Sequence, residues 1–538
     1  MPQVKPTLLI TSAAYADDSI CVELGRLPPS FLPLGNKRLY AHQIGSVGGH
    51  FGRIVLSLPE SFVVPPKDLR LLAEMGADIE RVPDGLSLGH SVAFCLRMIE
   101  PGAVAILHGD TLIYDIEFDH TDGFTCHTAD EDPYRWAVVS DGPEADVGRI
   151  SEHVAHAGNR ILSGFFSFSD SERLIRALTV TDGDFIEGLR LYNTELPQKA
   201  LRAGDWFDFG HFHTYYRSKT KLTTQRAFNG LQIDRVSVTK TSSDAFKMSC
   251  EAHWLKSLPD ELKLFIPTYL GPADEDAKAV GYRMERLLFS SLNDMFIFGR
   301  LNRRIWDTIF EECTFFLRSC KKYRAEGVTA KDCNSLYLPK TVKRLAEFAK
   351  ASGFPVDTPL QYNGVTVPSL RAIAEHTSTL IPTIAEDQMT VMHGDFCFSN
   401  ILYDSRGQQI RTIDPRGYLV HGEPTLYGDP RYDVAKLFHS AVGFYDLIVA
   451  GYYTVAAEGV QVTFDLLLDD AVTAVRDAFL DHDFDGIRGD DPALVAIAIH
   501  LFLSMLPLHH DNPQRQLAFL ANACRLYLSL DQKGESLP

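Results

Sequence analysis

The chain has 538 residues, of which 45% are hydrophobic and 23% are charged, and its formal net charge is −18 at pH 7. This length exceeds the size at which one hydrophobic core stops growing, so we expect two or three globular domains. The acidic charge and the lack of a Lys/Arg stripe argue against nucleic acid as a partner.

The start of the chain shows no secretory signal, because no basic region precedes a long apolar run there. The apolar stretch 495–508 has the length of a buried helix and is interrupted by His500, so no membrane span is predicted. Nine cysteines without Cys-x-x-Cys spacing argue against a disulfide framework and a zinc site. A reducing, cytoplasmic location fits these features best.

Strand-like and helix-like segments alternate from residue 7 to about residue 216. This alternation is typical of an α/β, Rossmann-like domain with a mixed, mostly parallel sheet, which binds ligands at the carboxyl ends of its strands. Asp110 ends one strand in the motif His-Gly-Asp, so it lies where such a sheet places its chemistry. The predicted strands lie at 7–11, 53–59, 103–110, 136–141 and 161–169.

The character of the sequence changes in the polar, basic stretch 217–230. A short β-rich section follows, then a helix, another strand and, from about residue 290, mainly helices that are interrupted by the stretch 389–417. We therefore place a boundary near residue 218, which predicts domains 1–218 and 219–538. The sequence contains no periodic repeat, so the second His-Gly-Asp motif, in the later domain, is not a repeated copy of the first.

The stretch 389–417 carries polar side chains suited to phosphoryl transfer. It predicts a strand, a tight loop and a hairpin, with Asp395 and Asn400 on the loop and Asp414 at the end of the hairpin. Phosphoryl transfer from a nucleotide requires a carboxylate that orients and deprotonates an alcohol, and further oxygen ligands that hold magnesium against the phosphates. One compact hairpin supplies this set.

The stretch HGDFCFSNILYD, followed by IDPRG, resembles the motif of the aminoglycoside phosphotransferase and choline kinase family, small-molecule relatives of the protein kinases. The resemblance covers about residues 225–525 and implies an α+β, protein-kinase-like fold with a small β-rich lobe and a helical lobe. It implies that Asp395 is the catalytic base and that Asn400 and Asp414 are magnesium ligands. It also implies that Asp433 starts a helix and braces the catalytic loop.

The same family implies an upstream ion pair and a hinge that receives adenine. Lys240 at a strand end and Glu251 on the next helix fit the pair, which directs the lysine to the phosphates of ATP. Lys247 competes for this role, because no clear glycine-rich loop precedes Lys240. Met284 and Glu285 resemble the hinge. An activation segment ending in Ala-Pro-Glu is missing, which argues against a protein substrate.

The N-terminal domain resembles the sugar-nucleotide pyrophosphorylases and cytidylyltransferases. The segments 27–44 and 86–94 carry this resemblance, together with the strand that leads to Asp110 and the late motif GDWFDFG around Asp208. The resemblance implies that Asp110 and Asp208 converge on magnesium. This ion would bridge the attacking phosphate and the triphosphate of a second nucleotide, such as CTP.

The phosphate loop of this second family is altered in the chain. An alignment without gaps places Tyr15, Asp17 and Ser19 where the family has two glycines and an arginine, and Pro29 where it has a lysine. Backbone amides and cations must neutralise the pyrophosphate, and an aspartate repels it. Three cations lie nearby in sequence: Arg26, Lys37 and Arg38.

Together the two resemblances predict a bifunctional enzyme. The C-terminal domain would use ATP and Mg²⁺ to phosphorylate a hydroxyl of a sugar or an amino alcohol. The N-terminal domain would couple a phosphate to a nucleotide, supplying activated precursors for surface polysaccharide, capsule or head-group synthesis. Two alternatives stay open: a monofunctional kinase whose N-terminal domain only binds a sugar or nucleotide, and a non-catalytic pseudokinase. The residues identify neither the acceptor, nor the second nucleotide, nor the oligomeric state.

Overall fold

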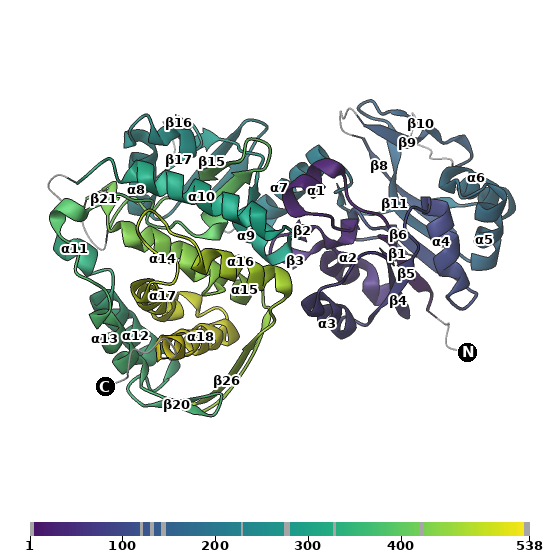
Figure 1. Cartoon of the computed structure of the whole chain (residues 1–538). Coiled ribbons are helices and arrows are strands. Elements are labelled where there is room, and N and C mark those ends of the chain that lie inside the picture. Colours follow the sequence, from purple (N-terminus) through teal and green to yellow (C-terminus); the bar gives the residue numbers. More distant parts are fainter. Residues whose placement is uncertain are drawn as a thin grey trace. The chain divides into compact units, whose positions relative to one another are not determined.

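The computed structural model describes residues 5–118, 122–129, 134–140, 147–226, 230–273, 280–325, 330–419 and 423–531. The chain divides into two compact units, Met1–Thr223 and Thr224–Pro538, and each is described by itself (Figure 1). The boundary that we predicted near residue 218 falls inside helix α7 (Phe212–Arg226). The polar stretch does not form a linker there, because Tyr215, Tyr216 and Leu222 are buried and hold the helix on unit 1.

Unit 1 is built on a nine-stranded sheet with the order β10-β9-β11-β6-β1-β4-β5 along its main path. Strands β6, β1, β4 and β5 run parallel, whereas β11 pairs antiparallel with β6, β8 and β9. The sheet is therefore mixed, as predicted, with its parallel part between β6 and β5. The strands of unit 1 are β1 (Thr7–Thr11), β2 (Pro33–Leu34), β3 (Lys37–Arg38), β4 (Arg53–Pro59), β5 (Ala77–Val82), β6 (Val104–His108), β7 (Thr111–Ile113), β8 (Gly123–Thr128), β9 (Arg135–Ser140), β10 (Ser151–Val154), β11 (Arg160–Phe168), β12 (Lys199–Leu201) and β13 (Trp206–Asp208).

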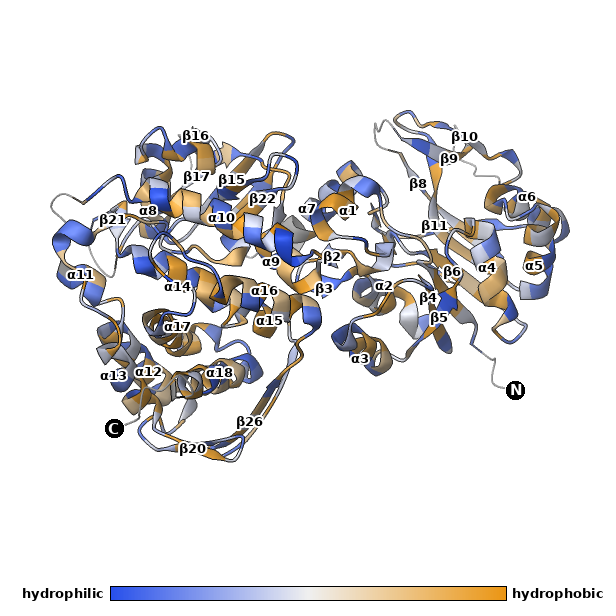
Figure 2. Cartoon of the chain, viewed as in Figure 1, coloured by the Kyte–Doolittle hydropathy of each residue, from blue (hydrophilic) through white to orange (hydrophobic). Residues whose placement is uncertain are grey.

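The core of unit 1 lies between this sheet and its helices. Leu8, Leu9 and Ile10 of β1 are fully buried, as expected for a parallel strand with both faces covered. Leu174 and Leu189 bring α5 and α6 onto the same apolar cluster, and Figure 2 shows hydrophobic colours on the central strands. Besides α7, the helices of unit 1 are α1 (Asp18–Leu24), α2 (Leu39–Val47), α3 (Pro66–Glu74), α4 (Leu88–Arg97), α5 (Ser171–Val180) and α6 (Phe185–Glu195).

Unit 2 begins with a four-stranded antiparallel sheet of order β14-β15-β17-β16, which carries one helix, α8 (Ala245–Ser257). Lys240 on β15 lies opposite Tyr282 on β17. Helix α8 begins after Asp244, whose side chain accepts a hydrogen bond from the Lys247 N–H. The strands are β14 (Gly230–Ile233), β15 (Ser237–Ser242), β16 (Tyr269–Pro272) and β17 (Val280–Glu285).

The rest of unit 2 is mainly helical and encloses a short hairpin, β22-β23, which pairs with β18. The hairpin and the short strands beside it are β18 (Ser290–Ser291), β21 (Thr390–Val391), β22 (Ile401–Asp404), β23 (Gln409–Thr412) and β24 (Tyr427–Gly428). The helices are α9 (Leu292–Phe298), α10 (Arg303–Cys320), α11 (Ala330–Asn334), α12 (Leu338–Ser352), α13 (Leu370–Thr379), α14 (Pro430–Ala441), α15 (Tyr445–Val449), α16 (Asp470–Leu480), α17 (Pro492–Met505) and α18 (Pro513–Asp531).

Helix α17 is the centre of the helical part. The stretch Pro492–His509 is long and apolar enough to cross a membrane by length and composition, but 72% of it is buried inside the protein. Helices α12, α13, α14 and α18 all contact α17. The apolar run is therefore explained by its place in a core.

A second four-stranded sheet in the helical part corrects the sequence reading, which expected strands after residue 290 only in the stretch 389–417. It has the order β20-β19-β26-β25 and lies at the bottom of Figure 1. Strands β25 and β26 pair antiparallel around a turn at Gly459, which has a positive φ of 60°. The strands are β19 (Leu360–Tyr362), β20 (Val365–Val367), β25 (Tyr453–Glu458) and β26 (Gln461–Leu466).

Candidate functional site

The loop that follows β21 is fixed by Asp433 in the first turn of α14. The Asp433 carboxylate accepts hydrogen bonds from the backbone N–H groups of His393 (2.7 Å) and Gly394 (2.8 Å). Burial raises the pKa of Asp433 to about 7, although these two bonds oppose the shift. Gly394 has a φ of 78°, and a Cβ atom there would lie 2.7 Å from the Cβ of Arg416. Asp433 thus braces the loop in the way that the resemblance implies.

Asp395 lies on this loop between an amide and an ammonium group. Its Oδ2 accepts a hydrogen bond from Asn400 Nδ2 at 3.0 Å, and its Oδ1 lies 2.7 Å from the Nζ of Lys436 on α14. Burial alone would raise the pKa of Asp395, but the charge of Lys436 outweighs it and lowers this pKa to about 2. The carboxylate is therefore ionised at neutral pH. Its side chain is 40% exposed, so it remains open to a ligand.

Lys240 joins the sheet, helix α8 and the hairpin end. Its Nζ lies 2.7 Å from Glu251 Oε2 and 2.9 Å from Asp414 Oδ1. Tyr282 donates a second hydrogen bond to Glu251 Oε2 at 2.8 Å. Burial acts to lower the pKa of Lys240, but the charges of Asp414 and Glu251 outweigh it and raise this pKa. Lys247 is half exposed, and its Nζ lies 3.8 Å from the other Glu251 oxygen, so Lys240 forms the buried pair.

Asp414 and Gly417 set the turn that follows β23. Asp414 has a φ of 57°, which is uncommon for a residue other than glycine and is a strained conformation typical of functional sites. Gly417 has a φ of 69°, and a Cβ atom there would lie 2.3 Å from the backbone oxygen of Cys250 on α8. The turn therefore packs directly against the helix that carries Glu251.

One cavity of about 350 Å³ brings these predicted residues together. Asp395, Asn400, Asp414 and Glu251 all line it, and Lys240 contacts two of them. The other lining residues are Lys247, Lys340, Arg344, Gly394, Pro415, Arg416, Tyr418, Tyr432, Lys436, Leu501, Ser504, Met505 and Leu508. Sequence reasoning missed Lys340, Arg344 and Lys436, because they lie on helices far from the motif in sequence.

The two predicted magnesium ligands of unit 2 offer oxygen atoms that suit this ion. Asn400 uses its amide N–H group on Asp395, which leaves Oδ1 as its acceptor. The Asp414 side chain is 39% exposed. Mg²⁺ favours one or two protein carboxylates or carbonyls completed by water and substrate phosphates. In the described part of the chain no group of three or more His, Cys, Asp or Glu side chains could hold a metal.

Met284 and Glu285 end β17, just before the segment 286–289 that leads to β18. The backbone N–H of Glu285 donates to Thr268, and its side chain accepts two further hydrogen bonds from the same residue. Met284 is buried and pairs with Val238 and Tyr269. Met284 and Glu285 thus lie at the end of a strand, and their role as a hinge that contacts adenine stays a prediction.

In unit 1 the structure brings Asp110 and Asp208 together. Strands β7 and β13 pair antiparallel, and the Phe209 N–H donates to the backbone oxygen of Asp110 at 2.8 Å. A Cβ atom on Gly210 would lie 2.6 Å from Asp110 Oδ2 and 3.5 Å from Asp208 Oδ1, so both carboxylates border this glycine. Burial, and then the charge of Asp110, raise the pKa of Asp208 to about 7. A cation bound here would relieve this repulsion.

Asp110 and Asp208 border a cavity of about 450 Å³. Five side-chain atoms of its wall are buried and lack a hydrogen-bond partner within the described residues: His108 Nε2, Trp136 Nε1, Trp206 Nε1, Asp208 Oδ2 and His211 Nδ1. Buried polar atoms are nearly always satisfied, so this concentration indicates a polar ligand or water. Sequence reasoning did not name Trp136 or Trp206 as site residues. The sequence marked them out as two of four tryptophans in the chain.

Not every cation that lies near the altered phosphate loop of unit 1 in sequence is free to bind a phosphate. Arg38 is buried and forms a bidentate pair with Asp68 at 3.1 and 3.2 Å, so it does not substitute for the missing arginine. The Arg26 guanidinium lies 4.1 Å from the centre of the Tyr15 ring. Asp17 caps helix α1 through its side chain, which explains an acidic residue in this loop.

The N-terminal part of the chain is similar to solved nucleotidyltransferase structures. UDP-glucose pyrophosphorylase complexed with UDP-glucose is 12% identical, and the alignment covers 41% of this chain and 99% of that one, with a TM-score of 0.32. The inositol-1-phosphate CTP transferase from T. maritima is 13% identical over 42% and 98% of the two chains, with a TM-score of 0.33. The nucleoside-diphosphate-sugar pyrophosphorylase from Vibrio cholerae RC9 is 12% identical over 40% and 99%, with a TM-score of 0.33.

No family model matches the chain, and no curated protein is similar to it.

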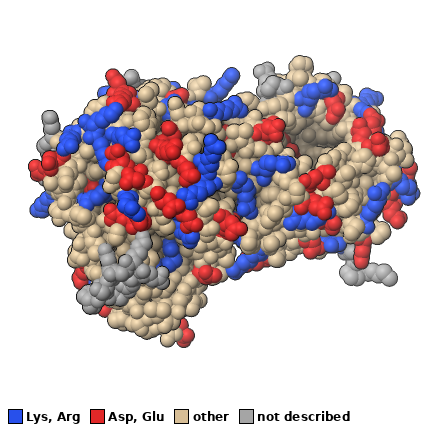
Figure 3. Space-filling model, viewed as in Figure 1, with Lys and Arg blue, Asp and Glu red and all other residues tan. Residues whose placement is uncertain are grey.

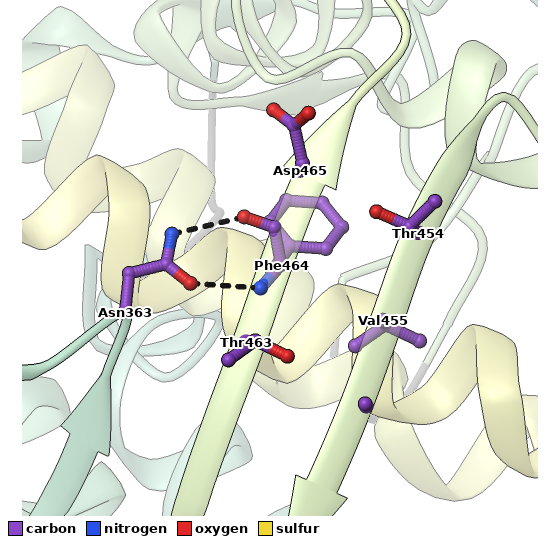
Figure 4. Close-up of a pocket in the computed structure, with 7 residues that line it drawn as sticks. Asn363, Thr454, Val455, Thr463, Phe464 and Asp465 are labelled. Atoms are coloured by element: carbon purple, nitrogen blue, oxygen red, sulfur yellow. Dashed lines mark hydrogen bonds between the residues drawn. The ribbon is translucent and has the colours of Figure 1, made fainter.

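A further hollow of about 370 Å³ lies on the second sheet of unit 2 (Figure 4). Asn363 there donates to the backbone oxygen of Phe464 and accepts from its N–H, both at 2.9 Å. The amide therefore continues the pairing of β19 with β26 beyond Tyr362. Asp465 is the single charged residue among those that line this hollow, so we assign no chemistry to it.

Proposed function

We propose that unit 2 transfers the γ-phosphoryl group of ATP to a hydroxyl group of a small molecule, a sugar or an amino alcohol by the family resemblance. The observation that carries this proposal is the continuous set of contacts from Glu251 through Lys240 to Asp414, which shares a cavity with the pair Asp395 and Asn400. This reaction requires a catalytic base, ligands for a metal ion and a lysine that binds the nucleotide phosphates.

Each residue has a role that follows from its contacts. Asp395, ionised at neutral pH, orients the acceptor hydroxyl and takes its proton as the bond to phosphorus forms. Asn400 holds the Asp395 carboxylate in place. Lys240, positioned by Glu251, contacts the nucleotide phosphates. Magnesium, held by Asn400 and Asp414, would neutralise charge on those phosphates.

We propose further that unit 1 transfers a nucleotide to a phosphate, and that Asp110 and Asp208 hold magnesium for this reaction. The support is their convergence beside a cavity that has several unsatisfied polar atoms. CTP and other pyrimidine nucleotides are first candidates as the second nucleotide. The alternative is a binding module for a sugar or nucleotide, and the burial of Arg38 on Asp68 favours it.

Loss of the base tests the activity of unit 2. The full-length protein, with ATP and Mg²⁺, is screened against a metabolite library, and phosphorylated products are read by mass spectrometry. Asp395→Asn should lower the transfer rate by about 10²–10⁴-fold, whereas Asp387→Asn, an exposed carboxylate of the same unit, should not change it. Transfer that survives Asp395→Asn, or no transfer to any compound, contradicts the proposed kinase activity.

Pyrophosphate release tests the activity of unit 1. CTP, UTP, GTP and dTTP are each supplied with sugar phosphates and amino-alcohol phosphates, and pyrophosphate is measured for the wild type and for Asp208→Asn. We expect release with one pairing, and its loss in the variant. If no pairing releases pyrophosphate while phosphorylation by unit 2 persists, unit 1 is a binding module.

A further inference from the structure

The cavity of unit 2 is lined by more basic side chains than acidic ones. Its three carboxylates already face lysines: Glu251 and Asp414 contact Lys240, and Asp395 contacts Lys436. Three more cations line the same cavity and, among the described residues, form no ion pair with these carboxylates: Lys340, Arg344 and Arg416. Of these, Arg416 also acts on Asp395 through its charge, secondary to Lys436. Lys340 and Arg344 lie one turn apart on α12, and Arg416 follows Asp414 in the turn after β23.

The contacts of these three cations leave their charge largely uncompensated. In the described part of the chain, no side chain forms an ion pair with the Nζ of Lys340. Arg344 pairs with Glu347 at 2.9 Å, but both side chains are about one third exposed, so this pair is weak. Arg416 donates to the Tyr432 hydroxyl at 3.2 Å and to a backbone oxygen, and its buried Nε has no partner.

The cations are close enough to repel one another. Tyr432 acts to raise the pKa of Lys340, but burial and the charges of its neighbours outweigh it and lower this pKa. The repelling neighbours are Arg416, Lys436 and Arg344. The chain as a whole is strongly acidic, and Figure 3 shows both signs of charge interspersed on the visible face. A partly buried group of like charges in such a protein indicates an anionic ligand.

We propose that the acceptor phosphorylated by unit 2 is itself an anion, a hydroxyl compound that carries a phosphate or a carboxylate group. This inference rests on the proposed kinase activity. The anionic group binds Lys340, Arg344 and Arg416, since guanidinium groups match phosphate and carboxylate oxygens in bidentate geometry. The hydroxyl group then lies at Asp395, which lines the same cavity.

The nucleotide and the acceptor use different cations. Lys240, held by Glu251 and Asp414, serves the phosphates of ATP. In the reaction the acceptor oxygen bonds to the γ-phosphorus, the bond between this phosphorus and the β,γ-bridging oxygen breaks, and the hydroxyl proton passes to Asp395. ADP leaves, and the product carries one phosphoryl group more than the acceptor.

The charge of the cavity also discriminates between acceptors. A quaternary or primary ammonium group would meet three cations, which costs binding free energy, and a neutral sugar would leave them without a counter-charge. Of the two acceptor classes that the family resemblance implies, the amino alcohols are therefore disfavoured. Apolar contact from Leu501, Met505 and Leu508 is left for the carbon skeleton.

A binding experiment with matched compounds tests this inference. Calorimetry on the full-length protein, saturated with Mg²⁺ and a non-hydrolysable ATP analogue, compares C3–C6 polyol phosphates and polyol carboxylates with their neutral parents, choline and ethanolamine. The variants are Lys340→Gln and Arg344→Gln. The matched control is Lys343→Gln, an exposed lysine on the same helix. We expect an anionic compound to bind, both variants to weaken it by about tenfold or more, and the control to bind it like the wild type.

The outcomes separate this inference from the proposed kinase activity. Affinity for the ATP analogue should stay within about twofold in all variants, because Lys240 and Asp414 are untouched. The inference is overturned if a neutral or cationic compound binds better than every anion, or if no anion binds at millimolar concentration. It is also overturned if the variants weaken binding of the ATP analogue and leave binding of the anion unchanged. Failure of the wild type to bind the ATP analogue contradicts the kinase activity. In that case a titration with the anions and no nucleotide still tests whether Lys340, Arg344 and Arg416 bind an anion.

Discussion

Lys240 and Lys247 lie within reach of the same carboxylate, but only one of them is held in place. Lys240 is 15% exposed and contacts both Glu251 and Asp414, whereas Lys247 is 51% exposed. We therefore expect Lys240→Met to reduce kcat/KM for ATP by about 10²-fold or more, and Lys247→Met to change it by about twofold. Steady-state kinetics with varied ATP measures both. An equal loss in the two variants would remove Lys240 from its assigned role.

Lys436 controls the ionisation of the proposed base. It is 13% exposed and neutralises Asp395, whose burial would otherwise raise its pKa. A carboxylate must be ionised to accept a proton, so activity is lost as the pH falls through its pKa. In Lys436→Met we expect the acidic limb of the pH–rate profile to move upward by one unit or more, and kcat at neutral pH to fall. A profile unchanged in shape would show that Lys436 serves only packing.

At the scale of single residues, the sequence predicted the partners that one motif or a family resemblance supplied, and it missed others that folding brings in. Asp395, Asn400 and Asp414 were predicted because a hairpin fixes their spacing. Lys436 was not, since it reaches Asp395 from helix α14, and no local pattern encodes that contact. Arg38 was one of three cations near the altered phosphate loop in the sequence, but the buried Asp68 of α3 binds it.

Among the structural elements, the turn after β23 should be sensitive to a single methyl group. Gly417 and Gly451 both have positive φ angles, 69° and 85°, so alanine at either position costs about 1–2 kcal/mol. At Gly417 the new Cβ also meets the backbone of α8 at 2.3 Å, whereas Gly451 has open space around it. Gly417→Ala should therefore lower the free energy of unfolding by about 3 kcal/mol or more, and Gly451→Ala by much less. Urea denaturation compares them, and equal losses would contradict the predicted clash.

Helix α17 contains a buried histidine that should make unit 2 sensitive to acid. His500 is 2% exposed, its Nδ1 lies 2.9 Å from the Thr341 hydroxyl, and burial lowers its pKa to about 4. The unfolded chain binds a proton near pH 6.5, so this group removes stability as the pH falls from 6.5 to 4, by about 3 kcal/mol in all. His500→Gln should be less stable than the wild type at pH 7.5. The difference should shrink or reverse near pH 4.5 in urea denaturation, and a constant difference would contradict the prediction.

The elements that the sequence predicted best are those with apolar runs of clear period. The strands at β1, β4 and β11 are apolar and bounded by turn formers, and they were found within one residue of their ends. Strands β19 and β20 were missed because each has three residues, too few to show a period. Strand β26 does alternate between buried and exposed residues, so the sequence carried a signal for this strand that was overlooked, whereas β25 shows no alternation.

At the scale of the whole molecule, the chain joins two units that each have their own core and their own cavity. The sequence predicted two domains from a change in character, with a boundary near residue 218, and the two compact units meet close by, between Thr223 and Thr224 in α7. The phosphate ester that we propose unit 2 forms is the kind of compound that the proposed reaction of unit 1 would use, which suggests consecutive reactions.

Variants inactivated in one unit each would show whether the two reactions form a sequence. Asp395→Asn should supply no phosphorylated acceptor, and Asp208→Asn should not release pyrophosphate from one. Starting from unphosphorylated acceptor, ATP and the second nucleotide, each variant alone should therefore give no nucleotide-linked product. A mixture of the two should restore it, because the intermediate diffuses between molecules, and mass spectrometry detects the product. If the wild type accumulates the phosphorylated acceptor and never the nucleotide-linked product, unit 1 does not consume what unit 2 makes.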